Sequence, residues 1–146
     1  EVKRIYLSID KDSEHPSDRQ IWLDVIRCHQ YNPLLSSPEG HLKLKRILKA
    51  WVANNPMLAY WQGVDSLLSP FLVLNFNDEP TALLCLQKLI NKFSRAFFST
   101  DSQTLYLQEY LVVYQQLLAY QDPELAVHLA DIAFKPELYA IPWFLT

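Results

Sequence analysis

Two short motifs carry side chains that could act together on a phosphate group. The motifs read I-x-x-D-x-x-R and Y-x-Q-G, and their defined positions are Ile21, Asp24, Arg27, Tyr60, Gln62 and Gly63. An arginine inserted into a separate GTPase can stabilise the negative charge that develops as the γ-phosphate of GTP leaves. A glutamine carboxamide, which holds both a donor and an acceptor, can align the attacking water. Arg27 and Gln62 are therefore the candidate catalytic residues, acting on a partner protein.

Each of these residues also has an ordinary structural interpretation. An arginine near a helix end commonly satisfies helix carbonyl groups in solvent. Asp24 lies three residues before Arg27, so an i,i+3 ion pair is as good an explanation as an orienting role. Ile21 and Tyr60 are expected in the core whatever the function is. Gly63 permits either a close backbone approach or a left-handed turn.

The elements that must position these residues are predicted to be helices. Apolar residues recur at helical spacing, and capping or proline signals separate successive segments. The predicted helices are 17 to about 27, 38–54, 64 to about 75, one beginning at 78, one beginning at 101 or 102, 122 to about 133, and a last one opening at 136. Arg27 is expected at the exit of the first of these helices or in the loop beyond it. Strand alternation is absent over any useful length, so the fold class is all-α. Residues 1–16 show no period and are predicted to form an N-terminal arm of a single domain spanning 1–146.

Two features of these helices carry further expectations. The helix from 38 to 54 has a basic face, and we expect it to be solvated rather than bound to an acidic partner or an anionic lipid. Its members are Lys43, Lys45, Arg46 and Lys49. In the helix that begins at Asp78, the apolar pattern places Phe93 on the inward face.

Composition excludes several classes of function. The 146 residues include two glycines, which leaves no glycine-rich loop for binding phosphate. The net charge of -3 argues against a nucleic-acid partner. The two cysteines and four histidines lack zinc-ligand spacing, so no cofactor or metal of its own is expected. Apolar stretches end well before the roughly 18 residues that span a bilayer, so no direct membrane insertion is expected.

The two motifs resemble those of TBC domains, a family of GTPase-activating proteins for Rab GTPases. The likeness continues through 48–51 ahead of the second motif and through 136–146, which is similar to the family's P-E-L-Y-A-x-x-W-F-L-T run. The resemblance implies an all-helical fold with Arg27 as an arginine finger and Gln62 as a glutamine finger. It also implies that Asp24 orients the finger loop, while Ile21 and Tyr60 pack beneath the motifs.

The resemblance further implies a partner and a location. The partner would be a Rab GTPase in the GTP state, and the GTP and Mg²⁺ would belong to that partner. The chain would be cytoplasmic and recruited to endomembranes through the Rab. Because the chain starts at Glu1 without a methionine and stops inside the apolar run 141–146, we expect a partial TBC domain, truncated at one or both ends, from a longer polypeptide.

Some positions depart from the family pattern and leave alternatives open. Cys28 stands where the family usually has threonine, and Trp61 stands where it usually has a small residue. A bulky indole beside Gln62 could contact the GTPase or alter the approach of the carboxamide. One alternative function is therefore a catalytically weak Rab-binding or scaffold module. Another is a structural helical interaction domain whose motif matches are accidental.

Overall fold

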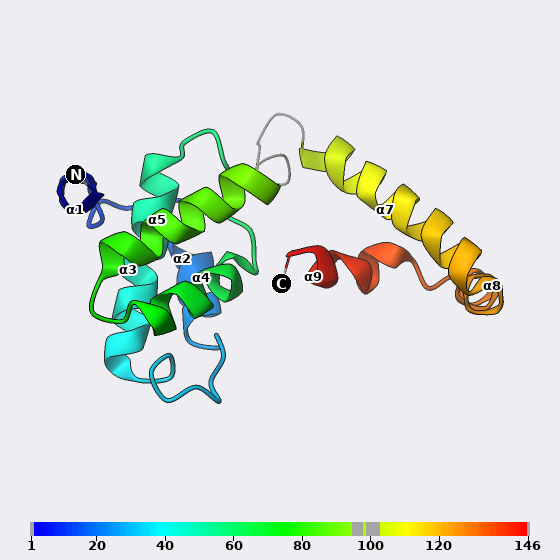
Figure 1. Cartoon of the computed structure of the whole chain (residues 1–146), viewed down its shortest axis with the longest axis horizontal. Helices are drawn as coiled ribbons and strands as arrows, with labels where there is room; N and C mark the ends of the chain where they lie inside the picture. The colour runs from blue at the N-terminus through cyan, green and yellow to red at the C-terminus, as the bar shows by residue number, and fades with distance from the viewer. Residues whose placement is uncertain (1, 95–97, 99–102, 146) are drawn as a thin grey trace.

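The computed structural model describes residues 2–94, 98 and 103–145 (Figure 1). The described residues contain helices and no strand, which confirms the all-α class. The elements in chain order are α1 (Val2–Ser8), α2 (Asp18–Val25), α3 (Pro38–Asn54), α4 (Val64–Leu74), α5 (Glu79–Leu89), the π-helical turn η1 (Ile90–Ser94), α7 (Gln103–Gln121), α8 (Pro123–Asp131), the 3₁₀ turn η2 (Pro136–Leu138) and α9 (Ala140–Leu145). None of the described helices has the length and apolar character that crossing a membrane requires.

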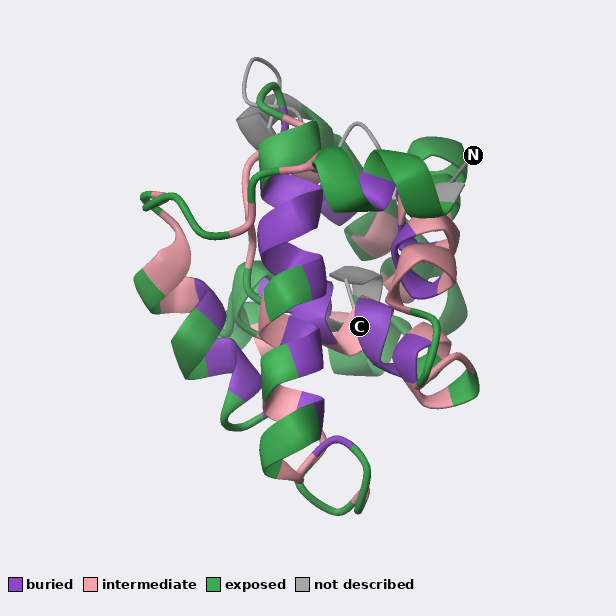
Figure 2. Cartoon of the chain, turned by 90° about the vertical axis from the view of Figure 1, so that its left-hand side faces the viewer, coloured by how far each residue is buried: buried purple, intermediate pink, exposed green. Residues whose placement is uncertain are grey.

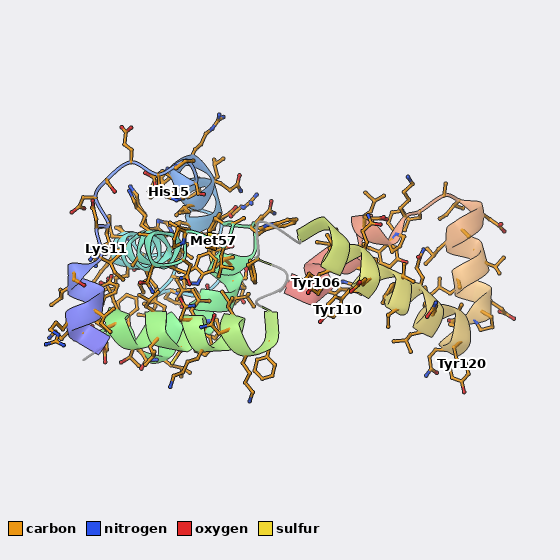
Figure 3. All side chains as sticks on the ribbon, turned by 90° about the horizontal axis from the view of Figure 1, so that it is seen from above. Lys11, His15, Met57, Tyr106, Tyr110 and Tyr120 are labelled. Atoms are coloured by element: carbon orange, nitrogen blue, oxygen red, sulfur yellow. The ribbon has the colours of Figure 1, made fainter. Side chains whose placement is uncertain are left out.

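Helices α1 to α5 form a compact body, and α7 and α8 extend from it as an arm (Figure 1). The chain returns along the arm so that α9 lies next to the body again. Figure 3 shows Tyr106 at the end of α7 nearest the body and Tyr120 at its far end. Aromatic rings pack together in the segment that follows α8, where the rings of Phe134 and Tyr139 stack with 5.1 Å between their centroids.

The core of the body is centred on α3. Ser37 caps this helix by accepting a hydrogen bond from the Gly40 amide at 2.9 Å, and Pro38 occupies the first turn, as the sequence predicts. Buried residues gather on the faces where the helices meet one another (Figure 2). Those fully buried from α2, α3, α4 and α5 include Ile21, Leu44, Ile47, Leu48, Trp51, Leu68 and Leu86.

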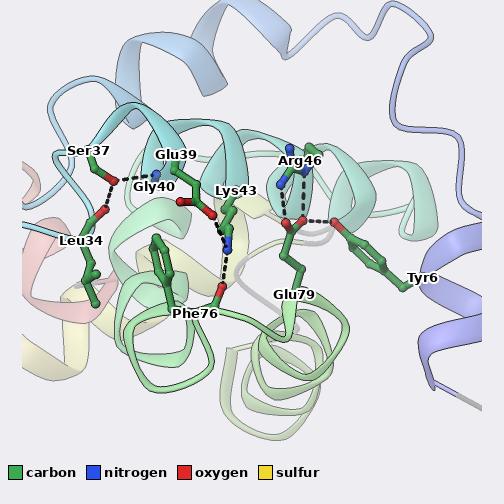
Figure 4. A network of polar contacts seen from close by, with 9 residues as sticks. All are labelled: Tyr6, Leu34, Ser37, Glu39, Gly40, Lys43, Arg46, Phe76 and Glu79. Carbon is green, nitrogen blue, oxygen red and sulfur yellow. Dashed lines mark hydrogen bonds and ion pairs between the residues drawn. The ribbon is translucent and has the colours of Figure 1, made fainter.

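The prediction of an irregular arm over residues 1–16 is wrong for its first half, because Val2–Ser8 is helical. Tyr6 is buried against the body, and its hydroxyl donates to the Glu79 carboxylate at 2.6 Å (Figure 4). This helix is too short to show a reliable hydrophobic period, and its packing on α5 supplies the stability that local sequence does not.

The prediction of a solvated basic face on α3 is wrong for Lys43 and Lys49, whereas Arg46 is exposed as expected. Lys43 and Lys49 are only 7% and 8% exposed. The Lys43 ammonium donates to the Phe76 carbonyl at 2.7 Å, and the Lys49 ammonium donates to Asp18 at 3.0 Å (Figure 4 shows Lys43). Long aliphatic stems let these cations lie along the core while their charged ends meet acceptors from other segments. The face therefore ties α3 to its neighbours.

Most predicted helix boundaries agree with the structure, but the end of α5 does not. Its last residues form the π-helical turn η1, and Phe93 is 63% exposed rather than inward. A π turn inserts an extra residue into the helical repeat and rotates the following side chains. Ser17 stands at the start of α2 without a side-chain capping bond, and the predicted helix start at 101 or 102 lies outside the described residues.

Candidate functional site

Arg27 lies just beyond the end of α2, as the sequence predicts. The helix ends at Val25, and the Arg27 amide donates to the Asp24 carbonyl at 3.1 Å in a closing turn. The Arg27 side chain is 53% exposed, whereas the Asp24 side chain is fully buried. The two form an ion pair, which confirms the i,i+3 interpretation. One guanidinium edge is thus anchored while the rest of the group faces solvent.

Asp24 connects the two motifs. Its Oδ1 accepts hydrogen bonds from Gln20 at 2.9 Å and from Arg27, and its Oδ2 accepts from the Tyr60 hydroxyl at 2.9 Å. Burial, and then the charge of Asp24, raise the pKa of Tyr60 well above its usual value. The Tyr60 hydroxyl therefore remains a donor at neutral pH. Through Asp24, the end of α2 and the segment before Gln62 are held together.

Gln62 is displayed on a turn at the start of α4. Gly63 has φ of 108°, in the left-handed region that residues with a Cβ rarely adopt. The left-handed-turn interpretation of this glycine is therefore confirmed. The Gly63 amide donates to Asp65 Oδ1 at 3.1 Å. Gln62 itself is exposed, and Trp61 is half-buried against the core. The turn thus directs the Gln62 carboxamide toward solvent, while the neighbouring Trp61 packs against the core.

The structure brings Arg27 and Gln62 to one open hollow of about 560 Å³. Its lining combines both motif edges with the C-terminal segment: Arg27, Cys28, His29, Trp61, Gln62, Gly63, Asp65, Ser66, Glu137, Leu138 and Ile141. Of the supporting residues, Ile21 is buried in the core and Tyr60 packs against it, as expected of core residues.

Sequence reasoning missed part of this lining. Glu137, Leu138 and Ile141 come from η2 and α9 and face the same hollow as the two motifs. The only signal for them was the family-like run over 136–146, which carries no information about where that segment lies in space. Asp65 was missed as well, because its carboxylate accepts from the amide two residues earlier, whereas the familiar turn pattern of aspartate bonds the backbone two residues later.

The electrostatics of the hollow favour positioning and charge stabilisation over nucleophilic chemistry by Cys28. Burial raises the pKa of the Cys28 thiol to about 12, so it is protonated at neutral pH. An exposed guanidinium and an exposed carboxamide share the hollow, which is open to solvent. Such a pair can contribute positive charge and a paired donor and acceptor to a group brought in by another molecule.

Comparison with known proteins places this chain in a family. The family described as Rab-GTPase-TBC domain matches residues 2–146. The TBC domain-containing protein kinase-like protein of Gallus gallus is 57% identical over 145 residues, covering 99% of this chain and 16% of that protein. The protein of the same name from Dictyostelium discoideum is 48% identical over 147 residues, covering 100% of this chain and 14% of that protein.

A solved structure agrees on the fold. The crystal structure of the Ypt/Rab-GAP domain of Gyp1p has a TM-score of 0.74 and 19% sequence identity, and the match covers 98% of this chain and 55% of that chain. The present chain spans 16% of the length of the Gallus gallus relative. Since the family match extends over nearly every residue, the chain belongs to the Rab-GTPase-TBC domain family.

Proposed function

We propose that the chain is a GTPase-activating domain that accelerates GTP hydrolysis by a Rab GTPase in trans. Arg27 enters the partner's nucleotide site and stabilises charge on the leaving phosphate, and Gln62 aligns the attacking water. The observation that carries the proposal is the meeting of these two exposed side chains at one hollow. Membership of the TBC family supports a Rab as the partner.

The supporting residues give this mechanism its geometry. Asp24 is fully buried and holds one side of the Arg27 guanidinium, so the finger reaches outward from a fixed base. Tyr60 shares Asp24 and lies two residues before Gln62, so both fingers depend on the same carboxylate. Gly63 permits the turn that presents Gln62. Preorganised groups of this kind stabilise a transition state because they need little rearrangement during the reaction.

The partner completes the site in this proposal. The Rab is in its GTP state and brings the nucleotide and Mg²⁺, while this chain contributes only side chains. The chain works within a longer polypeptide, as its matched relatives do, and is recruited from the cytoplasm to endomembranes through the Rab.

One observation favours a second candidate function. Trp61 lines the hollow directly beside Gln62. An indole in that position can fill space that the nucleotide site of a Rab would need. The alternative is therefore a module that binds GTP-loaded Rab and accelerates hydrolysis little or not at all.

A phosphate-release assay tests the proposal. The full-length protein is added in sub-stoichiometric amounts to a panel of GTP-loaded Rab GTPases. An arginine finger contributes about 10³ to 10⁵ in rate. We therefore expect Arg27→Lys to lose most of the acceleration, because an ammonium lacks the planar fork of the guanidinium. We expect Gln62→Ala to cause a comparable loss.

The control is Arg19→Lys, which changes an exposed arginine on α2 away from the hollow. It should leave the rate unchanged. Wild-type activity in Arg27→Lys would show that Arg27 does not act as the arginine finger. An unaffected rate in Gln62→Ala would show that a residue of the Rab itself, and not Gln62, aligns the attacking water. Binding of GTP-loaded Rab without acceleration would favour the second candidate function.

A further inference from the structure

A second route of buried polar contacts links the two motif segments independently of Asp24. Cys28 directly follows the arginine finger, and its Sγ lies 2.9 Å from Ser69 Oγ. The Ser69 hydroxyl donates to the Asp65 carbonyl at 2.8 Å. The Asp65 carboxylate in turn accepts from the Gly63 amide at 3.1 Å. The route therefore runs from the residue after Arg27 to the residue after Gln62.

Counting protons fixes the direction of the contact at its first step. A serine hydroxyl has one proton, and that of Ser69 is directed to the Asp65 carbonyl. The thiol of Cys28 must then be the donor to the Ser69 oxygen. Burial outweighs the lowering effect of the Ser69 contact and, together with the charge of Asp65, raises the pKa of this thiol to about 12, so the thiol keeps its proton at neutral pH.

The last step of the route controls the turn beneath Gln62. Asp65 is buried in the first turn of α4, where the positive end of the helix dipole favours a carboxylate. Its bond to the Gly63 amide fixes the peptide between Gln62 and Gly63. The same peptide lies at the centre of a turn that the Val64 amide closes by donating to the Trp61 carbonyl at 3.2 Å, so the Asp65 carboxylate adds a second restraint to that turn.

We propose that Cys28, Ser69 and Asp65 are positioning residues that hold the arginine finger and the glutamine finger in a fixed mutual geometry. The inference rests on the proposed function for its consequence, since the two fingers must reach the same nucleotide. A displacement of about 1 Å in a catalytic group can cost on the order of a hundredfold in rate. A change at Cys28 is therefore transmitted to the Gln62 turn through Ser69 and Asp65.

The linkage itself is tested without any activity measurement. In the full-length protein, amide hydrogen exchange is followed in a peptide covering 60–67 for the parent, Cys28→Ala and Cys28→Ser. Alanine removes the donor to Ser69, whereas serine replaces it with a hydroxyl. We expect exchange over 60–64 to be at least about threefold faster in Cys28→Ala and close to the parent in Cys28→Ser.

Two further variants complete this test. Ser69→Ala removes the middle of the route and should match Cys28→Ala, which keeps the linkage testable if either variant folds poorly. Cys85→Ala changes the half-buried cysteine of α5 and should leave this peptide unchanged. Equal exchange over 60–64 in the parent, Cys28→Ala and Ser69→Ala would overturn the inference, whether or not the protein activates a Rab.

Kinetics then test the consequence for catalysis. On a Rab that the parent activates, Cys28→Ala should lower kcat about tenfold while the KM for GTP-loaded Rab changes less than about twofold, and Cys28→Ser should restore kcat. An unchanged kcat in Cys28→Ala would overturn the positioning role. Failure of the parent on every Rab would instead overturn the proposed function, and the exchange measurement would still decide the linkage.

Discussion

At the scale of single residues, removing a hydrogen-bond donor to the buried Asp24 carboxylate should lower the free energy of unfolding. A buried carboxylate that loses a donor keeps its full desolvation penalty. Tyr60→Phe leaves Asp24 Oδ2 without its 2.9 Å hydrogen bond. We expect the free energy of unfolding to fall by about 1 to 3 kcal/mol in urea unfolding.

The control for this prediction is another tyrosine with a side-chain hydrogen bond. The Tyr31 hydroxyl lies 3.0 Å from His29 Nδ1 on the exposed surface, so Tyr31→Phe should change stability by less than about 0.5 kcal/mol. Because burial keeps the Tyr60 hydroxyl protonated, its effect should be constant from about pH 6 to 9. Equal stabilities of the two variants would show that the Tyr60 bond contributes nothing to the fold.

At the scale of elements, the start of α3 reverses the usual preference for alanine over glycine. The segment before the helix folds back on it, and the Ser37 hydroxyl donates to the Leu34 carbonyl at 2.7 Å (Figure 4). A Cβ added at Gly40 would lie 2.0 Å from the Leu34 carbonyl oxygen, which is backbone and cannot rotate away. We expect Gly40→Ala to destabilise the protein by about 1 to 3 kcal/mol in thermal unfolding.

Ala53 offers the matched comparison because it is an exposed position of the same helix. Because Ala53 lies near the end of α3, where the helix-interior cost of glycine applies only in part, Ala53→Gly should lower stability by up to about 1 kcal/mol. Alanine should therefore be the better residue at 53 and the worse residue at 40. A Gly40→Ala protein as stable as its parent would mean that the preceding segment moves away from α3 without cost.

The packing of α1 on the body depends on a carboxylate and should depend on pH. Burial acts to raise the pKa of Glu79, but hydrogen bonds from Arg46 and Tyr6 outweigh it, and the net pKa lies below its usual value of 4.5. A carboxyl with a lowered folded-state pKa contributes stability above its unfolded pKa and loses it as the pH falls through the folded pKa. The contribution of Glu79 is therefore present at pH 7 and lost below about pH 4.

Glu79→Gln tests this dependence in urea unfolding at several pH values. At pH 7 the variant should be less stable than the parent by about 1 kcal/mol, because it loses charge-assisted bonds to Arg46 and Tyr6. The difference should shrink below about pH 4, where the parent's carboxyl is also neutral. Glu14→Gln, at an exposed glutamate, should show no such trend, and a difference that stays constant with pH would contradict the prediction.

At the scale of the whole molecule, the sequence predicted those features that depend on residues close together in the chain, such as helix starts. Asp78 and Asp122 cap α5 and α8 through their side chains, and these signals lie within a few residues of the helices that they start. Contacts between distant segments were not predictable in this way. The burial of Lys49 depends on acceptors from residues 13 and 18, and the exposure of Phe93 depends on a π turn that apolar spacing does not reveal.

The same division holds for the candidate site. Motif spacing identified Arg27 and Gln62, and a resemblance gave them roles, but spacing does not bring together residues that the fold must carry back to one place. The shared hollow depends on the packing of α2 and α4 against α3, and its far wall depends on the return of the chain after α8. The site is therefore a property of the folded body, and its function should be lost with that body.

Leu68 provides the test of this dependence. It is 0% exposed on α4, so Leu68→Asp places an unpaired charge in the core at a cost of several kcal/mol. Since domains are stable by only about 5 to 15 kcal/mol, circular dichroism should show loss of cooperative unfolding. Leu74→Asp, on the same helix at 80% exposure, should stay folded. Because Arg27→Lys should also stay folded, loss of Rab activation in that variant would report on mechanism, whereas the same loss in Leu68→Asp would report only on the fold.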